Sequence, residues 1–248
     1  MTNLATFRVH LAPVGYEIDR IVIPLKQTKA DKLWILAHDN PSEDKAGPYL
    51  EKIKKECKKL GVEVKVAYSD RLSLFKTIKS IKDIISQEKG NYIFVNVASG
   101  SKIQAIAAMM ACSLSKSSDN LKPFYSLPER YAVFEGKQQS FGVKDTIPLP
   151  LYAIHTPHPK LLAALKIVSD QAGQRITKKA MAQIAEEQKI ITVNAEGENH
   201  SQARFASLES NIISPLEKEW KFVEVEKIGR NRWIKITQEG KDAAEFLL

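Results

Sequence analysis

The sequence predicts an α/β protein with a Rossmann-like domain, built on a mostly parallel sheet, followed by a winged helix-turn-helix domain. Three observations support this fold class. Over roughly the first half of the chain, short β-rich runs alternate with longer amphipathic runs, which is typical of parallel strands covered by helices. Two proline clusters then interrupt the alternation. After them the pattern changes to three helices, a hairpin and a closing helix.

The alternating half supplies the strands and helices of the first domain. The predicted strands, rich in β-branched and aromatic residues, cover residues 7–12, 32–38, 62–67, 92–97 and 123–126. The predicted helices have apolar residues at helical spacing and cover residues 18–27, 48–60, 72–87 and 103–115. Gly61 and Gly90 follow two of them, where helices commonly end. In such a fold, ligands gather at the carboxyl ends of the strands.

The domain boundary is predicted where prolines accumulate. Before it, Glu135-Gly136-Lys137 is expected to form a turn and residues 140–143 a short strand. Residues 147–150 are expected to form a stiff connection, because proline cannot continue a helix or a central strand. We therefore predict a first domain of residues 1–146, a linker of residues 147–159 and a second domain of residues 160–248. His155 and His158 lie in the linker, but the sequence offers no third ligand nearby, so no metal site is predicted.

The second domain has the element order of a winged helix-turn-helix. Helices are predicted over residues 161–172 and 178–188, the second capped by Thr177. A third helix begins at His200 or Ser201, and its buried side is formed by Ala203, Leu208, Ile212, Ile213 and Leu216. Strands over residues 222–226 and 233–237 are joined by a basic turn over residues 227–232, and residues 238–248 form a closing helix. Two scaffold helices, a recognition helix and a two-stranded wing are what this fold requires.

Charge and cysteine content limit the classes of partner. The formal net charge of +8 indicates an acidic partner such as a nucleotide or a nucleic acid. After His155 the chain carries 14 Lys and Arg against 13 Asp and Glu, so the surplus belongs to the first domain. Part of it lies on the predicted helix that contains Lys52, Lys54, Lys55, Lys58 and Lys59, which we expect to be a solvated face. Cys57 and Cys112 are far apart in sequence, so both are expected to be buried thiols.

The most informative segment is Tyr-Ile-Phe-Val-Asn-Val-Ala-Ser-Gly-Ser-Lys, residues 92–102. An apolar strand leads directly into a turn of small residues and then into a helix. The first N–H groups of a helix have no intrahelical partner and can bind phosphate oxygens, and Lys102 adds a positive charge beside them. The alternative is that Ser99 or Ser101 only caps the helix.

The loop after the first strand and the loop after the second strand are the other candidate ligand positions. The first loop, Ala12-Pro13-Val14-Gly15-Tyr16, lacks the Gly-x-Gly-x-x-Gly pattern of dinucleotide enzymes. The chain also lacks the Walker Gly-Lys-Ser/Thr sequence, so ATP hydrolysis of the P-loop type is not indicated. After the second strand, Asp39 and Asn40 either line a different nucleotide site or start a loop.

These motifs together resemble the CRISPR-associated Rossmann fold (CARF) regulators of archaea. The resemblance covers almost the whole chain and is strongest at residues 9–20 and 96–102. It implies a homodimer that binds a cyclic oligoadenylate, such as cyclic tetra-adenylate, across its two-fold axis. Gly15 and Tyr16 would contact base or ribose, while Ser99, Gly100, Ser101 and Lys102 would hold phosphates. Family members often have two adjacent glycines in this second motif, where the present chain has Ser99 before Gly100.

The predicted ligand residues combine both lines of reasoning. A cyclic tetranucleotide has four phosphates and two-fold symmetry, which suits a symmetric dimer that offers two helix N-termini and two lysines. The predicted ligand-binding residues are Pro13, Val14, Gly15, Tyr16, Asp39, Asn40, Ala98, Ser99, Gly100, Ser101 and Lys102. No cofactor other than this regulatory ligand is expected.

The winged helix predicts binding to double-stranded DNA. Gln202 and Arg204 would lie near bases, and the remaining predicted residues would meet phosphates or support the wing. Those residues are Lys178, Lys179, Lys227, Arg230, Asn231 and Arg232. Glu196, Glu198 and Glu209 add negative charge that opposes this role. Winged helices also serve as protein-interaction modules, which remains an alternative.

The sequence therefore favours a ligand-responsive transcription regulator, with two alternatives. One is a metal-independent ring nuclease in which Ser99, Ser101 and Lys102 position the ligand for attack by its own 2′-hydroxyl. No catalytic residue is assigned, because the nearby His10 and His38 lie on strands rather than in the loops. The other alternative is a winged-helix module with a different nucleotide ligand. The longest apolar runs are too short to cross a membrane and the start of the chain does not resemble a signal peptide, so a cytoplasmic protein is expected.

Overall fold

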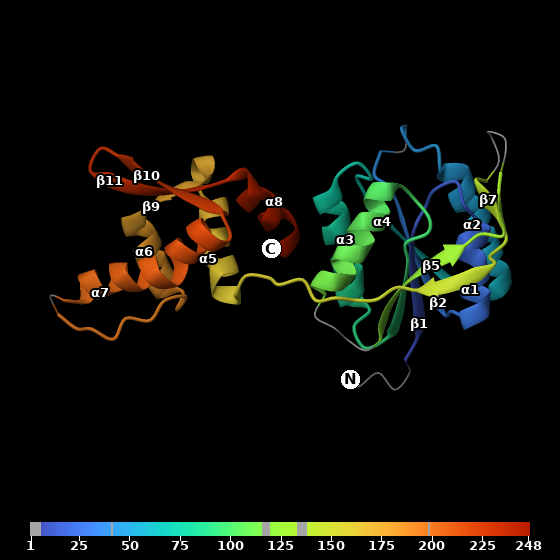
Figure 1. Cartoon of the computed structure of the whole chain (residues 1–248), viewed down its shortest axis with the longest axis horizontal. Helices are drawn as coiled ribbons and strands as arrows, with labels where there is room; N and C mark the ends of the chain where they lie inside the picture. The colour runs from blue at the N-terminus through green and yellow to red at the C-terminus, as the bar shows by residue number, and fades with distance from the viewer. Residues whose placement is uncertain (1–5, 41, 116–119, 133–137, 198) are drawn as a thin grey trace. The chain divides into compact units, whose positions relative to one another are not determined.

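The computed structural model describes residues 6–40, 42–115, 120–132, 138–197 and 199–248. The chain divides into two compact units, Met1–His155 and Thr156–Leu248, so the division falls within the predicted linker of residues 147–159 (Figure 1). The turn predicted at Glu135-Gly136-Lys137 and the position of Glu198 lie outside the described residues. Among the described residues, no helix is both long and apolar enough to cross a membrane.

The first unit is a Rossmann-like α/β domain, as predicted. Its sheet has the strand order β3-β2-β1-β4-β5-β8. The parallel strands are β1 (Arg8–Pro13), β2 (Lys32–His38), β3 (Glu63–Ser69), β4 (Tyr92–Asn96) and β5 (Leu121–Leu127). An edge strand, β8 (Asp145–Pro148), pairs antiparallel with β5.

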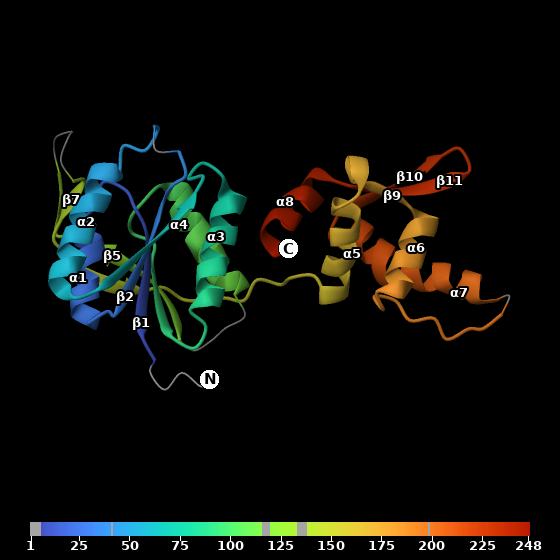
Figure 2. The ribbon, with the colours of Figure 1, turned by 180° about the vertical axis from the view of Figure 1, so that it is seen from behind.

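Helices cover both faces of this sheet. In Figures 1 and 2, α1 (Asp19–Thr28) and α2 (Gly47–Leu60) lie on one face, and α3 (Leu74–Gln87) and α4 (Lys102–Leu114) lie on the other. The helices begin and end within two residues of the predicted positions. Gly61 ends α2 with a φ of +71°, as the sequence predicts.

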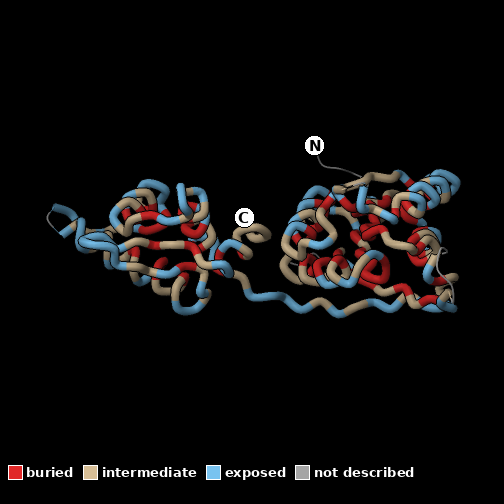
Figure 3. The backbone as a smooth tube through the Cα atoms, turned by 90° about the horizontal axis from the view of Figure 1, so that it is seen from above, coloured by how far each residue is buried: buried red, intermediate tan, exposed pale blue. Residues whose placement is uncertain are grey.

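The core of the first unit lies between the sheet and its helices, where Figure 3 shows the buried chain. Leu33 and Ile35 on β2 pack with Ile21 and Ile53 from the helices, and all four are almost fully buried. Cys57 and Cys112 are buried free thiols, as expected. Burial raises the pKa of Cys57 to about 11 and that of Cys112 to about 12, which makes both poor nucleophiles.

The edge of the sheet next to β5 differs from the prediction. Residues 145–148 form strand β8, although residues 147–150 are expected to be a connection. Pro148 is tolerated because β8 is an edge strand, where a missing N–H removes no inner hydrogen bond. A short hairpin, β6 (Arg130–Tyr131) with β7 (Ser140–Phe141), replaces the predicted strand over residues 140–143. Gln139 ties this hairpin to the first loop, because its N–H donates to the Tyr16 carbonyl at 2.9 Å.

The second unit is a winged helix domain. The helices are α5 (Pro159–Ser169), η1 (Ala172–Gln174), α6 (Lys178–Glu187) and α7 (Asn199–Leu208), which continues through the π-type segments η2 (Glu209–Ile213) and η3 (Pro215–Glu219). The sheet has the order β10-β11-β9, formed by β10 (Val223–Ile228), β11 (Asn231–Ile236) and β9 (Arg175–Thr177). The closing helix is α8 (Gln238–Leu247).

Three details of the second unit differ from the sequence prediction. Strand β9 was not predicted, and it extends the hairpin to a three-stranded sheet through Ile176 opposite Ile234. The predicted turn over residues 227–232 is mostly strand, and only Gly229 and Arg230 separate the paired residues Ile228 and Asn231. Gly229 has a φ of +60°, which allows this short turn. The third helix begins at Asn199, one residue before the earlier of the two predicted starts.

Candidate functional site

The candidate site lies where the order of the parallel strands reverses. Strands β1 and β4 are neighbours in the sheet, yet β2 follows β1 on one side and β5 follows β4 on the other. The two loops at the carboxyl ends of β1 and β4 therefore lie side by side, with their helices on opposite faces. In open α/β sheets this arrangement leaves a crevice that holds ligands.

The two loops are held together by direct backbone contact. The Ser99 hydroxyl, which is buried, donates to the Pro13 carbonyl at 2.7 Å. A Cβ atom on Gly15 would lie 2.9 Å from the Gly100 nitrogen, and one on Gly100 would lie 2.6 Å from Pro13 Cβ. Gly100 also has a φ of +79°. Glycine is therefore required at both positions by the close approach of the loops.

Ser101 caps α4, and capping was the alternative to phosphate binding that the sequence left open for this motif. Its hydroxyl accepts from the Gln104 N–H at 3.2 Å, and the Gln104 side-chain oxygen accepts from the Ser101 N–H at 2.9 Å. This capping box leaves the N–H groups of Lys102 and Ile103 without intrahelical carbonyl partners, as at any helix start. The Lys102 side chain is exposed beside them. Capping by Ser101 and anion binding by the helix start are therefore compatible.

A cavity of about 980 Å³ opens in front of these loops. Of the predicted ligand residues, Tyr16, Ala98, Ser99, Gly100, Ser101 and Lys102 line it. Pro13, Val14 and Gly15 are not among its lining residues. Pro13 and Gly15 contact the loop after β4, and the Val14 N–H donates to the Leu36 carbonyl at 2.9 Å. Lys45 and Tyr49, near the start of α2, line the cavity although the sequence analysis did not select them.

A second group of cavity residues was also missed by the sequence analysis. Glu17 and Arg20 are both buried, and the Arg20 Nη1 lies 3.4 Å from Glu17 Oε1. The other Glu17 oxygen accepts a short hydrogen bond from the Ser140 hydroxyl. Arg20 also lies over the Tyr125 ring, with 4.8 Å from its guanidinium carbon to the ring centroid. The signal in the sequence was weak, because an Arg at the start of an amphipathic helix is usually solvated.

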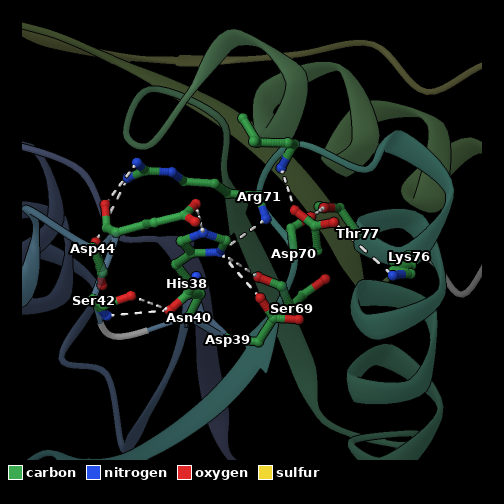
Figure 4. A network of polar contacts seen from close by, with 12 residues as sticks. His38, Asp39, Asn40, Ser42, Asp44, Ser69, Asp70, Arg71, Lys76 and Thr77 are labelled. Carbon is green, nitrogen blue, oxygen red and sulfur yellow. Dashed lines mark hydrogen bonds and ion pairs between the residues drawn. The ribbon is translucent and has the colours of Figure 1, made fainter.

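The predicted residues Asp39 and Asn40 lie in a different group, at the ends of β2 and β3 (Figure 4). His38 is buried, and its Nδ1 lies 3.2 Å from Asp39 Oδ1. The Asp70 carboxylate accepts from the Leu72 N–H, and Asn40 accepts from Ser42. Asp39 and Asn40 do not line the described cavity.

Within the described part of the chain, this group is also the one set of His, Cys, Asp and Glu side chains close enough to hold a metal ion. His38, Asp39 and Asp70 each offer a ligand atom, and these atoms lie within 4.8 Å of one another. His158 of the predicted histidine pair instead caps α5, because its Nδ1 accepts from the Lys160 N–H at 3.2 Å.

His10 lies on β1, as predicted, and is packed in the core. Its ring stacks on Phe94 with 4.9 Å between centroids, and its Nε2 lies 2.8 Å from the Thr28 hydroxyl. Burial lowers the pKa of His10 to about 3, so the imidazole stays neutral near neutral pH. His10 is not among the residues that line the cavity.

The predicted DNA-binding residues fall into paired and exposed groups. Lys178 makes a short ion pair with Glu209, and Arg204 lies 3.2 Å from Glu186. These two cations are therefore already neutralised by neighbours on the helices. The exposed residues are Lys179, Gln202, Lys227, Arg230, Asn231 and Arg232, of which the last four belong to the wing.

The fold and the cavity define a two-domain protein in which a Rossmann-like domain with a ligand-sized cavity precedes a winged helix domain. Residues 8–131, half of the chain, match the family model described as "HFX_2341_N:-like, N-terminal", and the chain belongs to this family. Residues 160–247 match the model of the DUF6293 C-terminal winged helix domain. Together these matches agree with the domain organisation that the CARF resemblance implies.

Sequence identity to an individual relative is low. The chain is 26% identical over 206 residues to the uncharacterized protein MJ1513 of Methanocaldococcus jannaschii, and the match covers 73% of the chain and 61% of that protein. The chain thus spans less than two thirds of this relative.

Two solved structures are similar at low TM-scores. Can2 of Sulfobacillus thermosulfidooxidans, in complex with cyclic tetra-adenylate, is 14% identical with a TM-score of 0.42 and coverage of 96% of this chain and 63% of Can2. Csm6 of Enterococcus italicus, bound to cyclic hexa-2′-fluoro-hexa-dAMP, is 10% identical with a TM-score of 0.46 and coverage of 87% and 56%. At these scores the similarity adds nothing to the argument from the site.

Proposed function

We propose that this protein is a cytoplasmic, ligand-responsive transcription regulator of the archaeal CARF type. Its Rossmann-like domain senses a cyclic oligoadenylate, most simply cyclic tetra-adenylate, and its winged helix binds double-stranded DNA. Two copies pair through their sensor domains and hold the ligand across the two-fold axis. Ligand binding favours one arrangement of the two winged helices and so changes DNA binding.

The observation that carries this proposal is the juxtaposition of the two loops at the point where the strand order reverses. The start of α4, with its unshared N–H groups and Lys102, faces a cavity large enough for several nucleotide groups. Phosphates gain from both the helix dipole and the lysine charge. The surplus of positive charge in the first half of the chain supports the same assignment.

Thermal unfolding with cyclic tri-, tetra- and hexa-adenylate tests ligand binding. A ligand that binds only the folded state raises the melting temperature. We expect one ring size to raise it in the wild type and in Lys89→Ala, which removes an exposed lysine outside the cavity, but not in Lys102→Ala. A rise that persists in Lys102→Ala would place the ligand elsewhere.

A DNA-binding titration with and without the same ligand tests regulation. If the ligand changes neither the affinity for DNA nor the region of DNA that is protected, the proposed coupling between the two domains is wrong.

A ring nuclease is the second candidate, and the contacts give it less support. The Ser99 hydroxyl is committed to Pro13, Ser101 accepts from the α4 backbone, and no histidine lines the cavity among the described residues. Cleavage would then rest on positioning and charge alone. Chromatography of cyclic tetra-adenylate after prolonged incubation with the protein decides this point, because a linear product lost in Lys102→Ala would favour the nuclease.

A further inference from the structure

The wall of the cavity formed by Glu17 and Arg20 contains a buried charge that is not fully satisfied. Arg20 is 5% exposed, and its Nε donates to the Ser126 carbonyl at 2.8 Å. Its Nη1 donates to Glu17 Oε1 at 3.4 Å, whereas its Nη2 is buried without a hydrogen-bond partner in the structure. A buried guanidinium N–H that lacks an acceptor is unfavourable, and Arg20 is one of the residues that line the cavity.

We propose that Arg20, Tyr125 and Tyr131 form a subsite for a purine base of the ligand, separate from the phosphate-binding start of α4. The base stacks on tyrosine rings and accepts a hydrogen bond from the Arg20 Nη2 through a ring nitrogen. This inference rests on the proposed function in one respect, which is that the cavity holds a nucleotide.

Charge balance favours a base over a phosphate at this wall. The Glu17 carboxylate, 4% exposed, lies beside the Arg20 guanidinium and neutralises it. Both Glu17 oxygens are engaged, one with Arg20 and one with the Ser140 hydroxyl, so the pair has no net charge to attract an anion. By contrast, Lys45 and Lys102 line other parts of the cavity without belonging to a buried pair, and the α4 dipole adds to them. A neutral acceptor therefore suits the Arg20 wall, and an anion suits the α4 wall.

The aromatic residues supply the stacking surface. Tyr125 lies under the Arg20 guanidinium, and Tyr131 on the β6–β7 hairpin is 61% exposed, so its ring is accessible to a ligand. A hydrogen bond with the Tyr125 side chain raises the pKa of Tyr131, so the Tyr131 phenol stays protonated near neutral pH. A purine is favoured because its larger ring system stacks over more area and offers several ring nitrogens as acceptors.

The test compares adenosine monophosphate with ribose 5-phosphate, which keeps the sugar and the phosphate but lacks the base. Binding to the full-length protein is measured by calorimetry. We expect the wild type to bind adenosine monophosphate at least about tenfold more tightly than ribose 5-phosphate, as is typical for a stacked base. This preference should disappear in Tyr131→Ala and return in Tyr131→Phe.

Two further variants control the result. Tyr92→Ala removes an exposed tyrosine outside the cavity and should leave the preference unchanged. Arg20→Lys keeps the charge beside Glu17 but removes the Nη2 donor. It should therefore weaken the binding of adenosine monophosphate and leave the binding of ribose 5-phosphate unchanged. Because Tyr131 is exposed, loss of folding cannot account for the Tyr131 result.

The base subsite is wrong if the wild type binds adenosine monophosphate no more tightly than ribose 5-phosphate, or if it binds neither compound saturably. It is also wrong if Tyr131→Ala keeps the preference. Parallel measurements with cyclic tetra-adenylate separate this outcome from failure of the proposed function. If the cyclic ligand binds while the base preference is absent, sensing stands and the subsite is wrong. If the preference is present while no cyclic ligand binds, the subsite stands and sensing of a cyclic ligand is wrong.

Discussion

At the scale of single residues, Gly100 is a position that leaves little freedom for substitution. It combines a left-handed backbone with contact to Pro13 on the neighbouring loop, so two separate constraints exclude a side chain. Gly61 has a similar φ of +71°, but a Cβ there would meet nothing within 4 Å. The two glycines therefore differ in packing while sharing the same backbone requirement.

We predict that Gly100→Ala destabilises the protein more than Gly61→Ala. Gly61→Ala should cost about 1 kcal/mol, because only the backbone is strained. Gly100→Ala should cost a further ~1–3 kcal/mol, because the new methyl group overlaps Pro13. Urea unfolding measures both values. Equal losses would show that the loops move apart without cost.

His10 should make stability depend on pH in one direction. The pKa of His10 is lowered to about 3 in the folded state and is near 6.5 in the unfolded chain. Folding therefore favours the neutral ring, so this contribution is complete above pH 6.5 and is lost as the pH falls toward 3.

We predict that between pH 7 and pH 5.5 the wild type loses about 1 kcal/mol of unfolding free energy through His10. His10→Gln, which keeps a polar group near Thr28, should lose less over the same interval. Urea unfolding at both pH values gives the comparison, and parallel losses in the two proteins would assign the pH dependence to other groups.

At the scale of elements, the start of α4 assigns capping and the proposed ligand contact to different residues. Ser101 closes the helix with Gln104, whereas Lys102 is exposed and takes no part in the capping box. The two residues are adjacent, yet their side chains have different roles.

We predict opposite effects for Ser101→Ala and Lys102→Ala. Ser101→Ala should lower the unfolding free energy by about 1 kcal/mol, as for loss of an N-cap, with a small effect on ligand affinity. Lys102→Ala should leave stability nearly unchanged and abolish the ligand-induced rise in melting temperature. Ser73→Ala, which removes the cap of α3, is the matched control for stability. If Ser101→Ala abolishes ligand binding at unchanged stability, its hydroxyl binds the ligand directly.

The wing and the start of α6 should contribute unequally to DNA binding. Arg232 is exposed on the wing, whereas Lys178 is already paired with Glu209. We predict that Arg232→Ala weakens binding and lowers the dependence of affinity on salt by about one unit, while Lys178→Ala has a smaller effect. Glu209→Gln should strengthen binding by freeing Lys178. Fluorescence anisotropy over a range of salt concentrations measures these slopes, and a larger effect of Lys178 would show that DNA breaks its ion pair.

Elements with strong local signals were predictable, and those defined by pairing were not. Helical periodicity and caps such as Thr177 and Gly61 located the helices, because these signals act within a few residues. Strands β8 and β9 are short, and only their partners β5 and β11 make them strands. In the site, the loop after β4 was predictable from its small residues. Arg20 and Tyr131 were not, because they meet only in the folded chain.

At the scale of the whole molecule, each unit has its own core. In the second unit, Leu165, Val168, Ile212 and Ile234 belong to a cluster formed by residues of that unit alone. The division between His155 and Thr156 therefore separates two bodies that can each bury their apolar surface. This arrangement suits a protein in which one part binds a ligand and the other binds DNA.

We predict two thermal transitions in calorimetry, of which cyclic tetra-adenylate raises only one. The ligand stabilises the unit that binds it, and the other unit gains nothing unless the two unfold together. In Lys102→Ala neither transition should respond. A single transition that the ligand raises as a whole would show that the units unfold cooperatively.

Strand β8 has a consequence for how two copies can associate. The Leu149 N–H donates to the Pro123 carbonyl at 2.9 Å, so by the alternation of an antiparallel pair the nitrogen of Pro148 faces away from β5. The outer border of the sheet therefore lacks a donor at this position, and the strand that forms it is only four residues long. Such a border resists joining to a strand of another molecule. Copies of this chain are thus disfavoured from forming a continuous intermolecular sheet at β8.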